Sequence, residues 1–149
     1  MDILGQLITS FIATAAFGVI FNAPKETLVK CGLVGMGGWI IYYIAEKYTG
    51  DSVLATLLAT LFVGIVSQEL AKFSKTPVII FSVAGIIPLV PGGLAYDTMR
   101  NFVEDDYFHA LALGAKVTLL SGSIAFGLVF SEVINQVIRK IRRNKVFRI

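Results

Sequence analysis

The stretch PVIIFSVAGIIPLVPGG (residues 77–93) decides how this chain must fold. It is as apolar as a membrane-spanning helix, yet Pro77 and Pro91 leave only 13 residues between them, and Pro88 lies within. A helix of that length rises about 20 Å, which is too short for a hydrocarbon core of about 30 Å. The stretch therefore predicts a span, 78–90, that proline and glycine break at membrane depth.

Four further apolar stretches flank this one, at 3–21, 28–44, 53–70 and 110–137. The 149 residues are 56% hydrophobic and 15% charged, with a mean hydropathy of +0.78. A soluble domain of this size cannot bury so much apolar surface. The sequence predicts an all-α membrane protein with five transmembrane helices, the fourth broken. Residues 1–149 then form a single transmembrane domain with no room for a soluble catalytic domain.

Charge predicts the orientation of these spans. Ten of the 13 basic residues fall on one face of an alternating topology: Lys25, Lys30, Lys72, Lys75, Arg139, Lys140, Arg142, Arg143, Lys145 and Arg148. Basic residues stay cytoplasmic. We therefore expect a multi-pass protein of the cell (inner or plasma) membrane, with its N-terminus outside and a basic cytoplasmic tail, 139–149, against anionic membrane lipid. This distribution also argues against a nucleic-acid partner for the net charge of +3.

Several function classes are disfavoured by what the chain contains. One His and one Cys make a metal site improbable. The sequence holds no Walker-type phosphate loop, and its single histidine, His109, lies at a span edge. We expect neither an enzyme nor a bound cofactor.

Local signals predict how the spans end and pack. Asn22 suits a turn, and Pro24 forbids a helix that continues through it. Thr56, Thr60 and Gly64 recur every four residues and form a narrow face for another helix. Near the inner end of the last span, Glu132 is expected to pair with the basic tail.

The broken segment is the first candidate site. A break at Pro88, Pro91, Gly92 and Gly93 leaves backbone N–H and C=O groups that bind substrates or ions in transporters. Two alternatives stay open, a proline kink and a loop at the outer surface. As a site, the break predicts that Gly92→Val impairs transport, because valine disfavours positive φ and blocks close approach. After the break, 94–103 predicts a short interfacial helix in which Asp97 pairs with Arg100.

Lys116 is the second candidate, because it lies about 9 Å into the last span. A charged side chain at that depth is a functional candidate. The alternative is a lysine that extends to the outer headgroups. Tyr96, Ser121 and Ser123 are nearby hydrogen-bonding candidates, although Ser123 also suits helix packing.

Two strings carry a resemblance to a known family. The first is FNAP (21–24), followed by Leu28, Cys31, Leu33 and Gly35. The second is FSVA (81–84), then IPLVPGG (87–93), Tyr96 and Met99. With the five-span layout, they resemble the small, five-span subunit of the split threonine/serine exporter family.

The resemblance implies a partner and a cargo. Members of the family occur as fused ten-span proteins or as two chains, and the larger chain carries five spans and a cytosolic hydrolase-like domain. The family is associated with efflux of threonine and serine, and some two-chain members with dicarboxylates such as succinate. A partner of opposite orientation would complete an inverted pair.

Together these observations predict a membrane subunit of a secondary exporter for small carboxylates, threonine and serine first. Transport would be alternating access coupled to a proton or ion gradient. The break would bind the substrate, Lys116 would attract its carboxylate, and Tyr96, Ser121 and Ser123 would offer hydrogen bonds. A higher oligomer is possible. The rivals are a non-transporting scaffold subunit and a passive channel.

Overall fold

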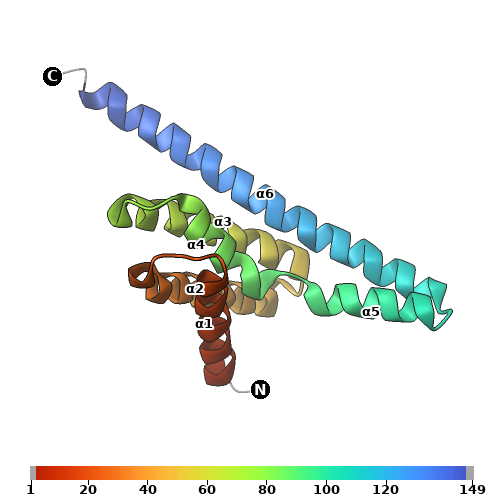
Figure 1. The fold of residues 1–149 in the computed structure, drawn as a ribbon. Helices are drawn as coiled ribbons and strands as arrows, with labels where there is room; N and C mark the ends of the chain where they lie inside the picture. Colours follow the sequence, from red (N-terminus) through yellow and green to blue (C-terminus); the bar gives the residue numbers. More distant parts are fainter. Residues whose placement is uncertain (1–2, 147–149) are drawn as a thin grey trace.

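The computed structural model describes residues 3–146, with side chains through Ile141. This part of the chain is helical, and its helices are joined by short turns (Figure 1). The elements are α1 (Ile3–Ile20), α2 (Lys25–Thr49), α3 (Ser52–Ser74), α4 (Val78–Ile86), the 3₁₀ helix η1 (Ile87–Leu89), α5 (Gly92–Val103) and α6 (Tyr107–Val146).

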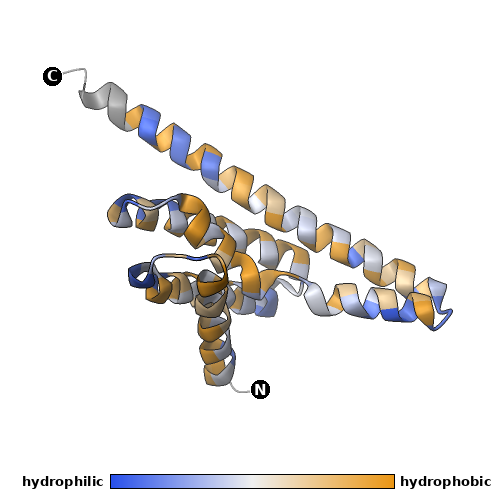
Figure 2. Cartoon of the chain, viewed as in Figure 1, coloured by the Kyte–Doolittle hydropathy of each residue, from blue (hydrophilic) through white to orange (hydrophobic). Residues whose placement is uncertain are grey.

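Four of these helices, α1, α2, α3 and α6, are long and apolar enough to cross a membrane. The fifth candidate is a bent pair, in which α4 with η1 meets α5 at an angle of 52°. Figure 2 shows the apolar residues spread along the helices, with hydrophilic residues gathered at their ends. The all-α membrane fold with a broken fourth span is confirmed.

The helices run further than the apolar stretches. α2 covers 25 residues and α3 covers 23, and both continue past the predicted spans 28–44 and 53–70. α6 has 40 residues, a length of about 60 Å. Hydropathy marks the part of a helix that suits hydrocarbon, whereas the helix continues until a cap ends it. α2 ends at Gly50, whose φ is 67°, and Asp51 Oδ1 then accepts the Val53 N–H at 2.8 Å to start α3.

Asn22 and Pro24 act as the sequence predicts at the turn between α1 and α2. Asn22 has a positive φ of 54°, which asparagine tolerates better than most residues. The Ala23 N–H then bonds to Gly18 O at 2.9 Å and closes the end of α1. Pro24 directly precedes α2 and caps it without needing an N–H.

Small residues set the helix contacts. A Cβ added at Gly35 would collide with Thr14 of α1, and one added at Gly64 would collide with Ser131 of α6. A Cβ at Gly127 would collide with Thr60 in the same way. The small faces predicted in the sequence are therefore packing surfaces. The two α3–α6 contacts share an offset of 67 residues, so α3 and α6 run parallel.

α5 runs back along the first part of α6 (Figure 1), where Thr98 lies against Gly114. This α5–α6 hairpin continues past the start of α3, since the α3–α6 register puts Leu119 level with Ser52. The predicted pair of Asp97 with Arg100 is not the one that forms. The Arg100 guanidinium instead donates to Glu104 Oε1 at 2.8 Å, because i+4 neighbours also share a helix face.

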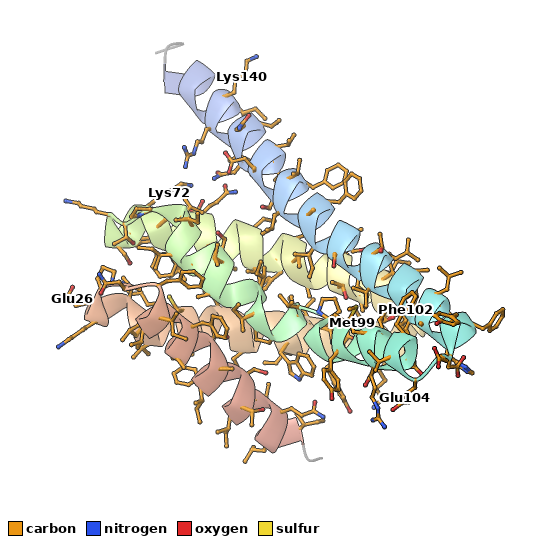
Figure 3. All side chains as sticks on the ribbon, turned by 45° about the vertical axis from the view of Figure 1, so that its right-hand side comes forward. Glu26, Lys72, Met99, Phe102, Glu104 and Lys140 are labelled. Atoms are coloured by element: carbon orange, nitrogen blue, oxygen red, sulfur yellow. The ribbon has the colours of Figure 1, made fainter. Side chains whose placement is uncertain are left out.

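Figure 3 shows the two ends of the molecule. Glu26, Lys72 and Lys140 lie toward one end, and Met99, Phe102 and Glu104 lie at the other. Lys30 Nζ also donates to Ser74 Oγ at 2.7 Å, which joins the start of α2 to the end of α3. The basic turns that the sequence assigned to one face therefore share one end of the bundle.

Candidate functional site

A cavity lies between α1 and α2 beside the broken span. Its volume is about 330 Å³. Its lining residues are Gln6, Thr9, Ser10, Ala13, Trp39 and Pro88. Four of these six side chains carry polar atoms, although the helices that supply them are mostly apolar. The cavity is open and its surface is mostly apolar, with a few polar atoms that can orient a small ligand.

One face of α1 supplies most of the lining. Gln6, Thr9, Ser10 and Ala13 follow the i, i+3, i+4, i+7 spacing that puts side chains on the same side of a helix. Thr9 Oγ1 donates to Gly5 O at 2.9 Å, and Ser10 Oγ donates to Gln6 O at 2.8 Å. Each hydroxyl therefore uses its hydrogen to bond to a backbone carbonyl of α1, and its oxygen can still accept a hydrogen bond from another group.

Trp39 fixes the amide of Gln6. Its indole Nε1–H donates to Gln6 Oε1 at 3.2 Å, from α2 to α1. With that oxygen occupied, the two N–H donors of Gln6 Nε2 remain, and Nε2 has no hydrogen bond within residues 3–141. The cavity therefore contains an oriented amide that can donate to a carboxylate.

Pro88 brings the break to this cavity. It lies in η1, where the α-helical bonding pattern gives way to a 3₁₀ turn that ends with Val90 N–H on Ile87 O at 3.3 Å. Pro91 then precedes α5. The cavity wall thus includes the proline that the sequence singled out in the fourth span.

The sequence predicts that Gly92 and Gly93 lie in the break, but the structure places them in a helix. They are the first two residues of α5, and a Cβ added at either position would meet no atom within 4 Å. Neither glycine has a positive φ; among glycines of the described chain only Gly50 does. The positive-φ reason for expecting Gly92→Val to impair transport is therefore wrong, whereas a close approach of substrate to this glycine stays a prediction.

The remaining predicted residues lie away from the cavity. Tyr96 is 69% exposed on α5, and Lys116 and Ser121 are exposed on α6. Ser123 is buried at 8% exposure on α6. Lys116 stands three residues before Leu119, about 4.5 Å beyond the level where α3 begins. No hydrogen bond or ion pair reaches its ammonium from the described part of the chain.

A second polar group, which sequence reasoning missed, joins the inner parts of α3 and α6. Gln68 Nε2 donates to Glu132 Oε2 at 3.0 Å, and Asn135 Nδ2 donates to Gln68 Oε1. Lys72 Nζ lies 3.5 Å from Asn135 Oδ1. Glu132 thus pairs with Gln68, and among the described side chains neither Arg139 nor Lys140 pairs with it; the rest of the tail, 142–149, lies outside the described side chains. The sequence signal that could have revealed this group is the presence of an amide side chain in each of two apolar spans, Gln68 in one and Asn135 in the other.

Within residues 3–141 no three His, Cys, Asp or Glu side chains gather where they could hold a metal ion. The functional groups in the cavity are amides, hydroxyls and an indole, which bind by hydrogen bonding.

Known proteins resemble this chain over most of its length. The sequence profile of the family described as "Threonine/Serine exporter, ThrE" matches residues 6–134. A protein from Corynebacterium glutamicum named threonine/serine exporter is 29% identical over 143 residues, covering 96% of this chain and 29% of that protein. An uncharacterized protein from Haemophilus influenzae is 25% identical over 136 residues, covering 86% of this chain and 46% of that protein.

The chain therefore spans less than half the length of these curated relatives. No solved structure matches it.

Proposed function

Because the chain belongs to the threonine/serine exporter family, we propose that it is a membrane subunit of a secondary exporter whose cargo is threonine and serine. The cavity between α1 and α2 is its substrate site. The observation that carries this assignment is the oriented amide of Gln6, held by Trp39 beside the broken fourth span. Dicarboxylates such as succinate are a second cargo class, since the same donors suit any small carboxylate.

The cavity suits a small amino acid in size, and its few polar atoms suit the charged groups of one. About 330 Å³ is at the low end of ligand pockets, which run from about 300 to 1,000 Å³. Gln6 Nε2 donates to the substrate carboxylate, and the Thr9 and Ser10 hydroxyl oxygens accept from its ammonium or hydroxyl. These hydrogen bonds to charged groups are the stronger kind.

Lys116 has a different part in this proposal. It stands on the α5–α6 hairpin, exposed, and therefore attracts carboxylates at the outer mouth of the pathway and does not hold them in the cavity. Tyr96, Ser121 and Ser123 lie on the same two helices. Gly92 and Gly93 expose the start of α5 next to them.

The orientation and the partner belong to the same proposal. The protein lies in the inner or plasma membrane with its N-terminus outside and its C-terminus in the cytoplasm, because the basic turns share one end of the bundle (Figure 3). The larger five-span subunit, with its hydrolase-like domain, supplies the other half of the pathway. A higher oligomer is compatible with such a partner.

Transport assays in the source organism test this function. A deletion strain is complemented with the chain, so that any partner is present, and efflux of labelled threonine is followed against an opposing gradient. Net export against the gradient separates an exporter from a channel. A scaffold subunit would restore efflux equally well whatever residues line the cavity.

Gln6→Glu is the sharpest variant for this assay. It keeps the size of the side chain and the acceptor for Trp39, but it replaces the two N–H donors with a carboxylate oxygen. We expect efflux to fall at least tenfold, because a hydrogen bond to a charged group contributes about 1.5–3 kcal/mol. The control is Ile12→Met, on the exposed side of the same helix. Normal efflux by Gln6→Glu at equal expression would remove the cavity from the pathway.

Lys116→Met belongs in the same experiment. It keeps the length of the side chain and removes the charge. An outer attracting role predicts a sharp fall in efflux at low substrate concentration. A lysine that only anchors the helix at the headgroups would leave efflux near normal.

A further inference from the structure

The polar group between α3 and α6 forms a continuous chain of donors and acceptors, here called the polar relay. It runs from the Lys72 ammonium to Asn135 Oδ1, from Asn135 Nδ2 to Gln68 Oε1, and from Gln68 Nε2 to Glu132 Oε2. Gln136 Nε2 adds a donor to Glu132 Oε1 at 3.2 Å. The two amides in the middle are deeply buried, with Gln68 exposed by 3% and Asn135 by 8%.

The two amides and Glu132 lie just inside the inner ends of the apolar stretches. Gln68 is two residues, about 3 Å, inside the end of 53–70, and Glu132 is five residues, about 7.5 Å, inside the end of 110–137. The register of α3 and α6 places Glu132 at least as deep, since Ser131 packs against Gly64. Glu132 is nevertheless exposed on the surface of the bundle. A carboxylate in an apolar span is costly, and such a residue is a candidate for a functional role.

The charge on Glu132 sets the direction of every hydrogen bond in the relay. An ionised carboxylate only accepts, so Gln68 must present its N–H₂ to Glu132 and its oxygen to Asn135. Asn135 must then present its own oxygen to Lys72, which only donates. The anionic acceptor at one end, Glu132, and the cationic donor at the other end, Lys72, therefore favour the same orientation of both amides.

The charged groups around Glu132 come from two helices. α3 supplies Lys72 and Glu69, which are paired with each other. α6 supplies Arg139 and Lys140, which are exposed and lie two turns further along. Only the Gln68 and Gln136 amides contact the carboxylate directly among the described residues. The relay, and not a salt bridge, is therefore what senses the charge of Glu132.

We propose that Glu132 is the proton-binding site through which this subunit couples export to a proton gradient, an inference that rests on the exporter function above. A proton adds to one carboxylate oxygen from one side of the membrane and leaves to the other side in the opposite conformation. The step forms and breaks one O–H bond and needs no other reactant. The substrate cavity and the proton site are separate.

Protonation reverses the relay. The protonated Glu132 gains an O–H donor and keeps one acceptor oxygen, so Gln68 is no longer held with its N–H₂ toward Glu132 and is free to turn its oxygen there. Gln68 then presents N–H₂ to Asn135, and Asn135 turns its own N–H₂ toward Lys72. Two donors cannot bond to each other, so the contact between Lys72 and Asn135 is lost. The state of Glu132 is thus transmitted along α3 to its inner end.

Inside-out membrane vesicles from the complemented deletion strain separate coupling from transport, because export appears in them as uptake. One assay measures uptake of labelled threonine driven by an imposed pH gradient. The other measures exchange of internal for external threonine at equal pH, which needs no net proton movement. The variants are Glu132→Gln, the conservative Glu132→Asp, and the control Glu26→Gln at the exposed start of α2.

Glu132→Gln should lose at least tenfold of the gradient-driven uptake and keep exchange within about twofold of the wild type, because its amide both donates and accepts like a protonated acid. Glu132→Asp should keep a gradient response, and Glu26→Gln should match the wild type in both assays. Wild-type gradient-driven uptake by Glu132→Gln overturns the proposal. So does loss of both activities with normal protein in the membrane, which would make Glu132 a structural residue.

The wild-type protein offers a second measurement. A hydrophobic carbodiimide reacts with protonated carboxyls in membranes, and mass spectrometry of the α6 peptide then reports the state of Glu132. Labelling should rise as the pH is lowered, while Glu26 stays unlabelled. Absence of labelling at every pH overturns the proposal even if Glu132→Gln does not fold. A wild type that moves no threonine in either assay would instead refute the exporter function.

Discussion

At the scale of single residues, the glycines of this chain divide by what surrounds them. Gly64 and Gly127 lie where α3 and α6 touch, so that any Cβ would overlap Ser131 or Thr60. Gly122 lies on the same helix as Gly127, yet a Cβ there would meet nothing within 4 Å. The absence of a side chain is therefore required at the first two positions by packing, and has no such reason at the third.

Gly64→Ala should destabilise the α3–α6 contact, because overpacking a tight contact costs about 1–3 kcal/mol. Gly122→Ala is the matched control and should leave the midpoint of thermal unfolding unchanged or higher, since alanine favours helix by about 1 kcal/mol over glycine. Thermal unfolding in detergent measures both. Equal melting of the two variants would show that the α3–α6 contact does not limit stability.

At the scale of elements, the fourth span is a short helix that two prolines separate from the next. α4 and η1 together rise about 20 Å, and α5 departs at 52°. A straight helix through this region would cross the bilayer as α3 does. The bend instead leaves Pro88 in the wall of the cavity and lets α5 pair with α6.

Pro88→Ala tests whether transport depends on this bend. Alanine restores an N–H and removes the ring that clashes with the preceding turn, so that α4 can continue as an α-helix. We expect efflux to fall severalfold while the protein remains folded. Spin labels on α4 and α5 should report a larger separation of their far ends. Pro77→Ala, at the start of α4, changes the same residue type without affecting the bend.

At the scale of the whole molecule, the two ends differ in charge. Basic residues mark the end where α2 begins and α3 and α6 finish, whereas acidic residues mark the α2–α3 turn and the α5–α6 turn. The ends of a membrane protein that carry Lys and Arg stay in the cytoplasm. The fold and the charge asymmetry therefore predict the same orientation.

Cysteine labelling measures this orientation. A cysteine at Ser52 should react with an impermeant thiol reagent added to intact cells, and a cysteine at Lys75 should react only after the membrane is opened. The native Cys31 is fully buried and should not interfere. Labelling of the Lys75 site in intact cells, with the Ser52 site protected, would reverse the topology.

The sequence by itself determined the class of the fold and its interruptions. Hydropathy is a property of each residue and sums along the chain, so the apolar stretches, the membrane and the short fourth span follow without knowledge of any contact. The turn at Asn22 and Pro24 is equally local, since φ preferences belong to single residues. The small stripes predicted close helix contacts for the same reason.

Only the tertiary structure decided which side chains meet. Gln6 faces Trp39, and Gln68 faces Asn135, across 33 and 67 residues of chain. Such pairs depend on the rotation and register of neighbouring helices. The close contacts at Gly35, Gly64 and Gly127, where no Cβ fits, determine that register to within one turn. The same packing carries Lys116 onto the α5–α6 hairpin, away from the cavity beside Pro88. Hydropathy does not encode this register, because every face of a helix in lipid can be apolar.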